Sequence, residues 1–361
     1  MNALESQLDY CLGTTTPGLG EAFEVAPGIK WVRMQLPFAL NHVNLWLLRD
    51  ELPGEAGAAA HPGWTIVDCG VDNAVTRAAW EEVFASALDG LPVLRVVVTH
   101  MHPDHIGLAH WLCARWKVRL WISATDYNVA RVASAASAGF GGPLSAAFMA
   151  EHGMVDRDAV SQVGARVNYY RSLVPALPET FRRLVDGGKV TIGSGPARAD
   201  WACHVGYGHA PEHMAFHNEA ARVLISGDMV LPRISTNVSV VDVEPEADPL
   251  TLYLDSIERM RSIDAGALVL PSHGLPFKGL HTRIDQLQAH HAERFAEVLT
   301  ACAEAPRSAF DLVPVLFKRP LDLHQMTFAM GESIAHCHAL WLRGVLVRAV
   351  GTDGVIRFEP A

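Results

Sequence analysis

The sequence HMHPDH at residues 100–105 places four side chains that can bind a metal within six positions, directly after the apolar segment LRVVV at residues 94–98. The apolar segment has the length and the branched side chains of a buried β-strand. If the chain leaves this strand in an extended conformation, alternate residues share a face. His100 and His102 can then hold one metal ion between their imidazoles. Packing alone does not explain such a concentration of ligand side chains.

Asp104 and His105 lie beyond the turn expected at Pro103. After that turn they can face a second metal close to the first, which is the paired arrangement that clamps both sides of a hydrolytic displacement. The apolar residues that follow recur with helical spacing at Ile106, Leu108, Trp111 and Leu112. We therefore expect a helix that buries this face against the preceding strand.

Three later segments repeat the pattern of a short apolar strand followed by a ligand-type residue. His209 follows the strand-like residues 201–205, Asp228 follows 223–225, and His273 follows 267–270. Loops at strand ends run over the surface of a domain and often carry its functional residues. We therefore expect these side chains to share one cleft with residues 100–105.

This ordered set resembles the metallo-β-lactamase superfamily of binuclear metallohydrolases, over roughly residues 30–280. The resemblance implies an α/β fold, an αββα sandwich in which two sheets lie between helical layers. It implies a catalytic domain at residues 1–280 with a helical cap inserted at about 125–195. Residues 281–361 resemble a small winged-helix-like α+β domain, with helices expected at 281–303, 308–317 and 322–343 and strands at 345–350 and 355–358.

The resemblance also implies a set of metal ligands. The first metal would be held by His100, His102 and His209. The second would be held by Asp104, His105 and His273, with Asp228 bridging the two. Asp68, in the stretch IVDCG at residues 66–70, matches an early acidic motif of the family. Its implied role is to accept the free ring N–H of a ligand histidine, which fixes the tautomer of that ring.

The remaining histidines are not expected to bind metal. His213 is interpreted as a residue that supports the ligands or begins a helix. His336 and His338 fall in the predicted helix 330–342, where residues two apart face different ways. We expect His290 and His291 to be solvated, and His110 and His217 to be ordinary core or surface imidazoles.

Two divalent ions imply a bridging hydroxide as the nucleophile, since one zinc ion alone lowers the pKa of its bound water to ~7. Asp104 and Asp228 are the implied catalytic carboxylates, and Asp104 is the candidate for passing a proton to the leaving group. Mixed imidazole and carboxylate ligands suit zinc best and also accept iron, manganese or nickel.

The predicted ligand set limits the classes of reaction that the chain is expected to catalyse. The resemblance places a cysteine at the position of Asp228 in true binuclear β-lactamases, and a carboxylate at the position of His102 in flavodiiron oxygen reductases. Glyoxalase II matches in its ligands, but no basic cluster for glutathione is evident. We expect a cytoplasmic hydrolase of an ester, thioester or lactone, of the hydroxyacylglutathione hydrolase, thioesterase or lactonase type. The alternatives are a phosphodiesterase or ribonuclease of the same fold, or a binding module whose metals are structural.

Composition is consistent with a small-molecule enzyme. The net charge of −10 argues against nucleic acid and anionic membranes as partners. Acidic residues slightly outnumber basic ones from residue 281 onward, so the C-terminal region is expected to serve packing or homodimerisation. The six cysteines show no paired spacing, which suits a reducing compartment. No apolar run reaches the length of a membrane span.

Two irregular regions are predicted. The Pro-, Gly- and Ala-rich residues 52–63 are expected to form a surface loop. In the insert, small residues at 133–142 are expected to form a pliable entrance, followed by helices at 158–170 and 178–185. The insert offers the apolar side chains Phe140, Phe148, Met149, Met154, Tyr169 and Tyr170. Most are expected to pack on the body, and one or two to reach the substrate.

Overall fold

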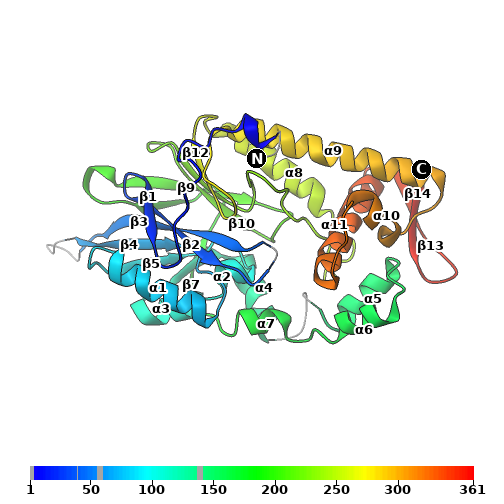
Figure 1. The fold of residues 1–361 in the computed structure, drawn as a ribbon, viewed down its shortest axis with the longest axis horizontal. Helices are drawn as coiled ribbons and strands as arrows, with labels where there is room; N and C mark the ends of the chain where they lie inside the picture. The colour runs from blue at the N-terminus through cyan, green and yellow to red at the C-terminus, as the bar shows by residue number, and fades with distance from the viewer. Residues whose placement is uncertain (1–3, 39, 55–59, 136–140) are drawn as a thin grey trace.

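The computed structural model describes residues 4–38, 40–54, 60–135 and 141–361. Its centre is a pair of β-sheets packed face to face, with helices on both outer faces (Figure 1). Between the sheets lies a core of aromatic and branched side chains, which includes Trp31, Trp46, Trp201, Phe216 and Ile225. The predicted α/β fold with two sheets between helical layers is confirmed.

The first sheet has strand order β1-β2-β3-β4-β5-β6-β7. Strands β1 to β4 are antiparallel neighbours, and β4 to β7 are parallel. The bounds are β1 (Ala22–Ala26), β2 (Ile29–Gln35), β3 (His42–Leu52), β4 (His61–Val67), β5 (Val93–Val97), β6 (Leu120–Ser123) and β7 (Phe181–Leu184). Its outer face is covered by α1 (Ala74–Ser86), α2 (Pro103–Ile106), α3 (Ala109–Trp116) and α4 (Ala124–Ala135).

The second sheet has strand order β12-β11-β10-β9-β8, and only the pair β11 and β12 is parallel. Its strands are β8 (Lys189–Ile192), β9 (Ala199–Gly206), β10 (His213–Asn218), β11 (Val223–Gly227) and β12 (Leu268–Pro271). Its outer face packs on α8 (Pro249–Arg259), α9 (Leu280–Glu304) and α11 (Leu323–Leu342). Short 3₁₀ helices lie near the N-terminus at η1 (Glu5–Gln7), between β8 and β9 at η2 (Gly195–Ala197), and after α8 at η3 (Met260–Ser262).

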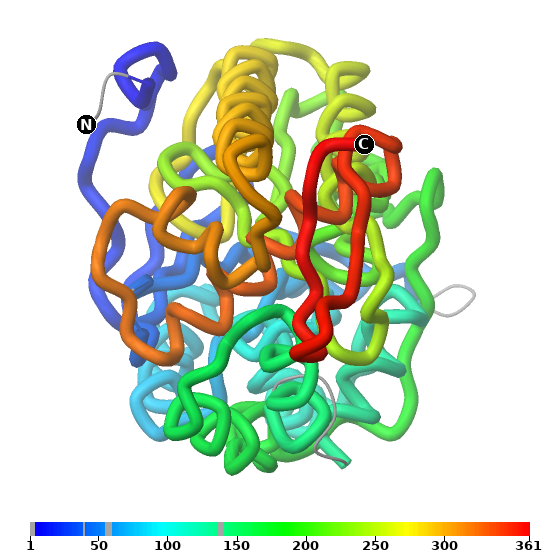
Figure 2. The backbone as a smooth tube through the Cα atoms, turned by 90° about the vertical axis from the view of Figure 1, so that its right-hand side faces the viewer, coloured from blue at the N-terminus to red at the C-terminus, as the bar shows by residue number. Residues whose placement is uncertain are grey.

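The C-terminal elements lie at one end of the sandwich (Figure 1). α9 leads into α10 (Ala309–Leu316), α11 and the hairpin of β13 (Leu346–Val350) and β14 (Ile356–Pro360). Figure 2 looks onto this end, with the hairpin in red beside the end of α9. Helices and strands therefore occupy the predicted C-terminal ranges. Within the described residues, no helix is both long and apolar enough to cross a bilayer.

The insert contains α5 (Pro143–Glu151), α6 (Arg157–Gly164) and α7 (Tyr169–Leu173). The helix predicted at 178–185 is wrong, because residues 181–184 form β7 and pair with β6. Edge pairing and the stacking of Arg182 on Trp121, at 4.3 Å, override the local helical pattern. The C-terminal end of the predicted insert thus belongs to the two sheets, through β7 and β8, which confines the extra helices to the segment between α4 and β7.

The insert packs on the C-terminal helices as well as on the body. Met149 and Met154 are buried against Val313 and Met330. Phe148 is buried in the core beneath α9 and α11. Phe140 and part of the predicted entrance at 133–142 lie outside the described residues.

The loop predicted at 52–63 is shorter than expected. β3 continues to Leu52 and β4 begins at His61, and these two residues are paired across the strands. Pro62 is tolerated in the sheet near the start of β4. Residues 55–59 of this predicted loop lie outside the described residues.

Candidate metal centre

His100, His102, His209, Asp228 and His273 lie in turns at strand ends on one edge of the sandwich, and Asp104 and His105 lie in the short helix α2 that follows β5. β5 ends at Val97 and α2 begins at Pro103, so the residues between them are free of both elements. The turn is held from two sides: the N–H of Met101 donates to Asp126 Oδ1 at 2.9 Å, and the hydroxyl of Tyr170 donates to the carbonyl of Met101 at 2.5 Å. The ligand turn is therefore fixed by groups from α4 and α7.

Three imidazoles converge on one point. His100 Nε2 lies 2.9 Å from His102 Nδ1, His102 Nδ1 lies 3.0 Å from His209 Nε2, and His209 Nε2 lies 3.2 Å from His100 Nε2. Each ring nitrogen carries either one proton or one lone pair, so three mutual contacts cannot all be hydrogen bonds. Nitrogens bound at 2.0–2.1 Å to one tetrahedral zinc lie about 3.3 Å apart. The triangle fits a shared cation.

A second group lies beside this triangle. Asp104 Oδ2 is 3.5 Å from the Nε2 atoms of both His105 and His273. Asp228 Oδ2 is 3.5 Å from His273 Nε2, 3.7 Å from His105 Nε2 and 3.3 Å from His209 Nε2. One carboxylate oxygen therefore faces ligands of both groups. The structure brings all the predicted ligand residues together, in three overlapping sets whose ligand atoms lie within 4.8 Å of one another.

The other nitrogen of most of these rings has a fixed acceptor. His209 Nδ1 donates to the carbonyl of Asn237 at 2.8 Å, and His273 Nδ1 donates to the carbonyl of His42 at 2.8 Å. His100 Nδ1 lies 3.0 Å from the hydroxyl of Thr99. These contacts set the tautomer that leaves Nε2 free to bind a metal.

Asp68 has the geometry expected for a group that supports the ligands. Its Oδ2 lies 2.8 Å from His105 Nδ1, and its Oδ1 accepts from the backbone N–H of Thr99 at 2.8 Å. Its φ of 65° is in the left-handed region, which is uncommon for a residue other than glycine. Such backbone strain is found where a side chain must be held at a functional position.

The buried charges favour neutral triad histidines beside a cationic position. Burial, reinforced by neighbouring imidazoles, lowers the pKa of His100 well below its ordinary value. Burial, followed by the effect of His209, lowers the pKa of His102 to about 3. Burial opposes a charge on His105 as well, but the carboxylates of Asp104 and Asp228 raise its pKa well above the ordinary value. Neutral imidazole is the form that binds metals. The carboxylates of Asp104 and Asp228 favour a positive charge near His105, which a bound cation would supply.

His213 supports the site without belonging to any of the three sets. It begins β10 rather than a helix, and its Nε2 accepts from the backbone N–H of Asp228 at 3.1 Å. The left-handed Gly227 precedes Asp228, and a Cβ on it would lie 2.4 Å from His213 Nε2. His213 thus fixes the backbone that presents Asp228.

Asp126 is the main residue of the site that sequence reasoning missed. It is fully buried, and it accepts from the N–H groups of Met101 and Glu212, the latter at 2.7 Å. It therefore ties the turn after β5 to the turn that carries His209. Burial raises its pKa to about 6. In the sequence Ser123-Ala-Thr-Asp126 it resembles an ordinary helix cap, so no signal pointed to the site.

The prediction that His290 and His291 are solvated is wrong for His291, which is buried with Nδ1 3.2 Å from His336 Nε2. The face of α9 that carries it packs on α11, which the local sequence did not reveal. His338 does not share this contact with His291, and its Nδ1 lies 3.0 Å from the carbonyl of Ala247. His110 lies 3.6 Å from Asp72, and His217 packs on His204.

Two of the apolar insert residues are connected with the site, Tyr170 through its hydrogen bond to the carbonyl of Met101 and Tyr169 through the charge of Asp104. Burial, and after it the charge of Asp104, raises the pKa of Tyr169. Its ring lies 5.7 Å from that of His324 on α11, which stacks at 5.8 Å on Phe38. The rings of Phe38 in the β2–β3 turn, His324 in the C-terminal region and Tyr169 in the insert therefore form a row of contacts, which ends at the phenol whose pKa responds to burial and to the charge of Asp104.

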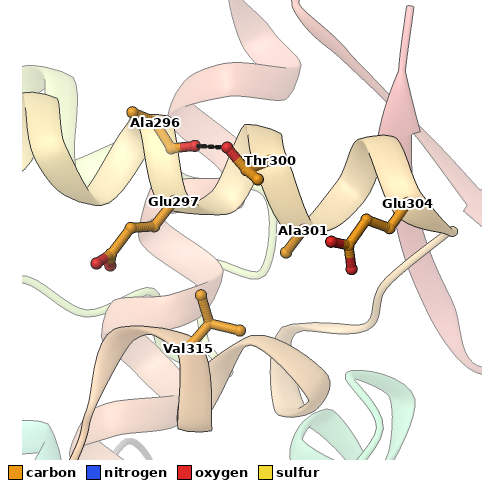
Figure 3. Close-up of a pocket in the computed structure, with 6 residues that line it drawn as sticks. All are labelled: Ala296, Glu297, Thr300, Ala301, Glu304 and Val315. Atoms are coloured by element: carbon orange, nitrogen blue, oxygen red, sulfur yellow. Dashed lines mark hydrogen bonds between the residues drawn. The ribbon is translucent and has the colours of Figure 1, made fainter.

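Two surface hollows lie apart from the ligands. One of about 390 Å³ between α9 and α10 is lined by Glu297, Glu304 and small or apolar side chains, and in it Thr300 donates to the carbonyl of Ala296 (Figure 3). The other, of about 420 Å³, reaches His42, whose carbonyl orients His273. Neither hollow is lined by a candidate ligand.

Comparisons with known proteins agree with this architecture. A family model for the "Metallo-beta-lactamase superfamily" matches residues 61–273, and one for the "Metallo-beta-lactamase-like, C-terminal domain" matches residues 295–361. The crystal structure of a beta-lactamase domain protein from Burkholderia ambifaria is 54% identical, with a TM-score of 0.91 over 100% of both chains. A metallo-beta-lactamase family protein from Thermus thermophilus is 25% identical, with a TM-score of 0.74 over 94% of this chain and 100% of that chain. A protein described as "Probable metallo-hydrolase YqjP" from Bacillus subtilis (strain 168) is 23% identical over 316 residues, 86% of this chain and 91% of that protein.

Proposed function

Because this chain belongs to the metallo-beta-lactamase superfamily, a family of metallo-hydrolases, we propose that it hydrolyses the carbonyl group of an ester, thioester or lactone. The observation that carries the proposal is the position of Asp228. Its Oδ2 lies 3.3 Å from His209 Nε2 and 3.5 Å from His273 Nε2, so one carboxylate faces both groups of imidazoles. That arrangement suits two adjacent ions better than one isolated structural ion.

The donor atoms divide into two sites. The imidazoles of His100, His102 and His209 would hold one divalent ion, and Asp104, His105 and His273 would hold the other, with Asp228 shared. Two such ions supply an activated water at neutral pH and polarise a carbonyl oxygen. Imidazole and carboxylate donors together favour zinc, with iron and manganese as alternatives that the same ligands accept.

Asp104 is the carboxylate that can exchange a proton with the substrate. Its side chain is 18% exposed, against 7% for Asp228, so it borders the open side of the centre. The imidazole of His105 opposes the effect of burial and lowers the pKa of Asp104 to about 2, which keeps it ionised. An ionised carboxylate at this edge can take a proton and return it to a departing oxygen or sulfur.

The surroundings of Asp104 favour an organic acyl group over a polyanion. Burial, and after it the charge of Asp104, raises the pKa of the Tyr169 phenol, and the rings of His324 and Phe38 continue from Tyr169 as an aromatic row. Flat rings offer apolar contact to an acyl chain or a lactone ring. A polyanionic substrate would instead favour a groove rich in arginine and lysine.

Hydrolysis of a small substrate panel tests this function. Metal-replete protein is assayed with an acyl-thioester, a homoserine lactone, an aryl ester and a bis-aryl phosphodiester, in parallel with the variant His102→Ala. We expect turnover of at least one carbonyl substrate and its loss in the variant. Cleavage of the phosphodiester alone would overturn the carbonyl assignment, and equal activity in His102→Ala would overturn the assignment of the site.

A further inference from the structure

The C-terminal helix α11 contacts the segment that orients a metal ligand. His209 Nδ1 donates to the backbone carbonyl of Asn237 at 2.8 Å. The side-chain amide of the same Asn237 donates to Glu332 Oε2 at 3.3 Å. Asn237 thus connects Glu332 to the imidazole of His209, which is assigned to the first metal, through two hydrogen bonds.

The loop around Asn237 is docked on α11 by several contacts. The hydroxyl of Ser239 donates to Asn237 Oδ1 at 2.8 Å, and the N–H of Val240 donates to the carbonyl of Gly331 at 3.1 Å. A Cβ at Gly331 would lie 2.6 Å from Ser239 Cβ, so helix and loop approach each other closely. The orientation of the Asn237 carbonyl therefore depends on α11.

Glu332 is an unusual residue for this position in a helix. It is only 9% exposed, and burial raises its pKa to about 7 against the opposing hydrogen bond from Asn237. Burying a carboxyl group carries a desolvation cost that helix packing alone does not require. The hydrogen bond that the carboxyl group accepts from Asn237 offsets part of that cost.

We propose that Glu332 is a positioning residue for the first metal site. It holds the side chain of Asn237, which fixes the Asn237 carbonyl and, through it, the ring of His209. The C-terminal region thereby becomes part of the support of the metal centre. This inference rests on the metal assignment proposed above for His209.

Affinity for the first metal tests the proposal in the full-length protein. Metal-free protein is titrated with Co²⁺, and the affinity is measured by competition with a chelator. We expect Glu332→Ala to weaken binding at the histidine triad about tenfold, as for other groups that orient ligands. Glu332→Gln keeps an oxygen that can accept from Asn237, so it should stay close to the original protein.

The matched control is Ser333→Ala. Ser333 is the next residue on α11, is also buried, and its hydroxyl donates to the carbonyl of Ala309 at 2.7 Å, a group outside the metal centre. The variant Ser333→Ala therefore loses one buried hydrogen bond of α11, while the hydrogen bonds of Asn237 to Glu332 and Ser239 remain. An equal loss of Co²⁺ affinity in Ser333→Ala and Glu332→Ala would overturn the proposal, because both would then act through the stability of the helix.

The variant Asn237→Ala tests whether Glu332 acts through the side chain of Asn237, when the Co²⁺ affinities of both single variants and the double variant are compared. If Glu332 acts through the Asn237 side chain, the double variant should be no worse than the more damaging single variant, since coupled residues are not additive. Additive losses would show that Glu332 acts by another route.

The tautomer of His209 in the metal-free protein tests the role of Glu332 independently of the proposed hydrolase function. Long-range proton–nitrogen spectra of labelled histidines report the tautomer of His209, identified by comparison with His209→Gln. We expect a single Nδ1–H tautomer in the original chain and in Ser333→Ala, and a mixture in Glu332→Ala. An unchanged tautomer in Glu332→Ala would refute the role of Glu332 even if the protein binds metal. If the original chain binds no Co²⁺, the proposed function fails, while the tautomer measurement still decides the role of Glu332.

Discussion

The carboxylate of Asp68 lies 2.8 Å from Nδ1 of His105, and it also accepts the backbone N–H of Thr99. One side chain therefore fixes both the ring of a ligand and the start of the turn that carries the other ligands. Its left-handed backbone, with φ of 65°, shows that the fold accepts local strain to place it there. The role implied for Asp68 by the sequence thus has a matching geometry.

Replacing Asp68 by Asn should weaken the second metal site. The amide can present N–H groups to His105 Nδ1, where the ring needs an acceptor, so metal affinity should fall by about 10- to 100-fold. Competition with a chelator measures the affinity. Asp72→Asn is the control, because Asp72 holds Arg77 at 2.8 Å and lies outside the ligand set. Equal affinities in the two variants would contradict this role.

Replacing Asp104 by Asn should affect turnover more than binding of the first metal. The amide cannot take a proton, so kcat should fall by about 10²- to 10⁴-fold, with the largest loss for substrates that have poor leaving groups. Steady-state kinetics on a series of aryl esters, with metal content measured on the same samples, checks this. A variant with both metals and full kcat would exclude Asp104 as the proton carrier.

Tyr169 should contribute to substrate binding through its ring. Truncation in Tyr169→Ala removes apolar contact worth roughly 2 kcal/mol, so KM for an acyl substrate should rise by at least about tenfold while kcat changes little. Tyr169→Phe keeps the ring and should retain a KM close to the original. A loss in Tyr169→Phe as large as in Tyr169→Ala would mean that the hydroxyl, rather than the ring, makes the contact.

Gly227→Ala should be far more damaging than Gly90→Ala. Both glycines have positive φ, 56° and 73°, so alanine is strained by about 1 kcal/mol or more at either position. Only at Gly227 would the new Cβ also meet His213, at 2.4 Å, whereas at Gly90 nothing lies within 4 Å. Thermal unfolding should show a larger decrease in Tm for Gly227→Ala, together with loss of metal. Equal decreases would mean that the contact with His213 does not constrain the turn.

The stability of the metal-free protein should depend on pH through Glu332. Burial raises its pKa from 4.5 to about 7, so the folded state favours the protonated carboxyl group. The associated stability is fully present below pH 4.5 and is lost as the pH rises through about 7. Relative to Glu332→Gln, which does not titrate, the original protein should therefore become less stable across this window. Denaturant unfolding at several pH values measures this, and parallel curves for the two proteins would contradict it.

The sequence predicted the parts of the molecule that depend on local pattern. Ligand-type residues at the ends of short apolar strands, from His100 to His273, marked both the fold and the cluster. What it could not predict depends on packing between distant segments. Residues 181–184 form a strand because β6 offers an edge, and His291 is buried because α11 covers it.

The supporting residues were missed for the same reason. Asp126 looks like a helix cap in the sequence, yet its carboxylate links two ligand turns. Glu332 looks like an exposed helix residue, yet it reaches the loop that orients His209. Neither role has a local signature, because each arises from a contact between segments that are far apart in the chain.

Metal content per chain tests the central claim most directly. After reconstitution with zinc and removal of loosely bound ions, elemental analysis should give two ions per chain, which follows from two ligand groups that share Asp228. His102→Ala and His273→Ala should each retain about one, since each removes a ligand from a different group. His110→Ala, outside both groups, should retain two. One ion or fewer in the original protein, or an unchanged content in His102→Ala and His273→Ala, would contradict the account.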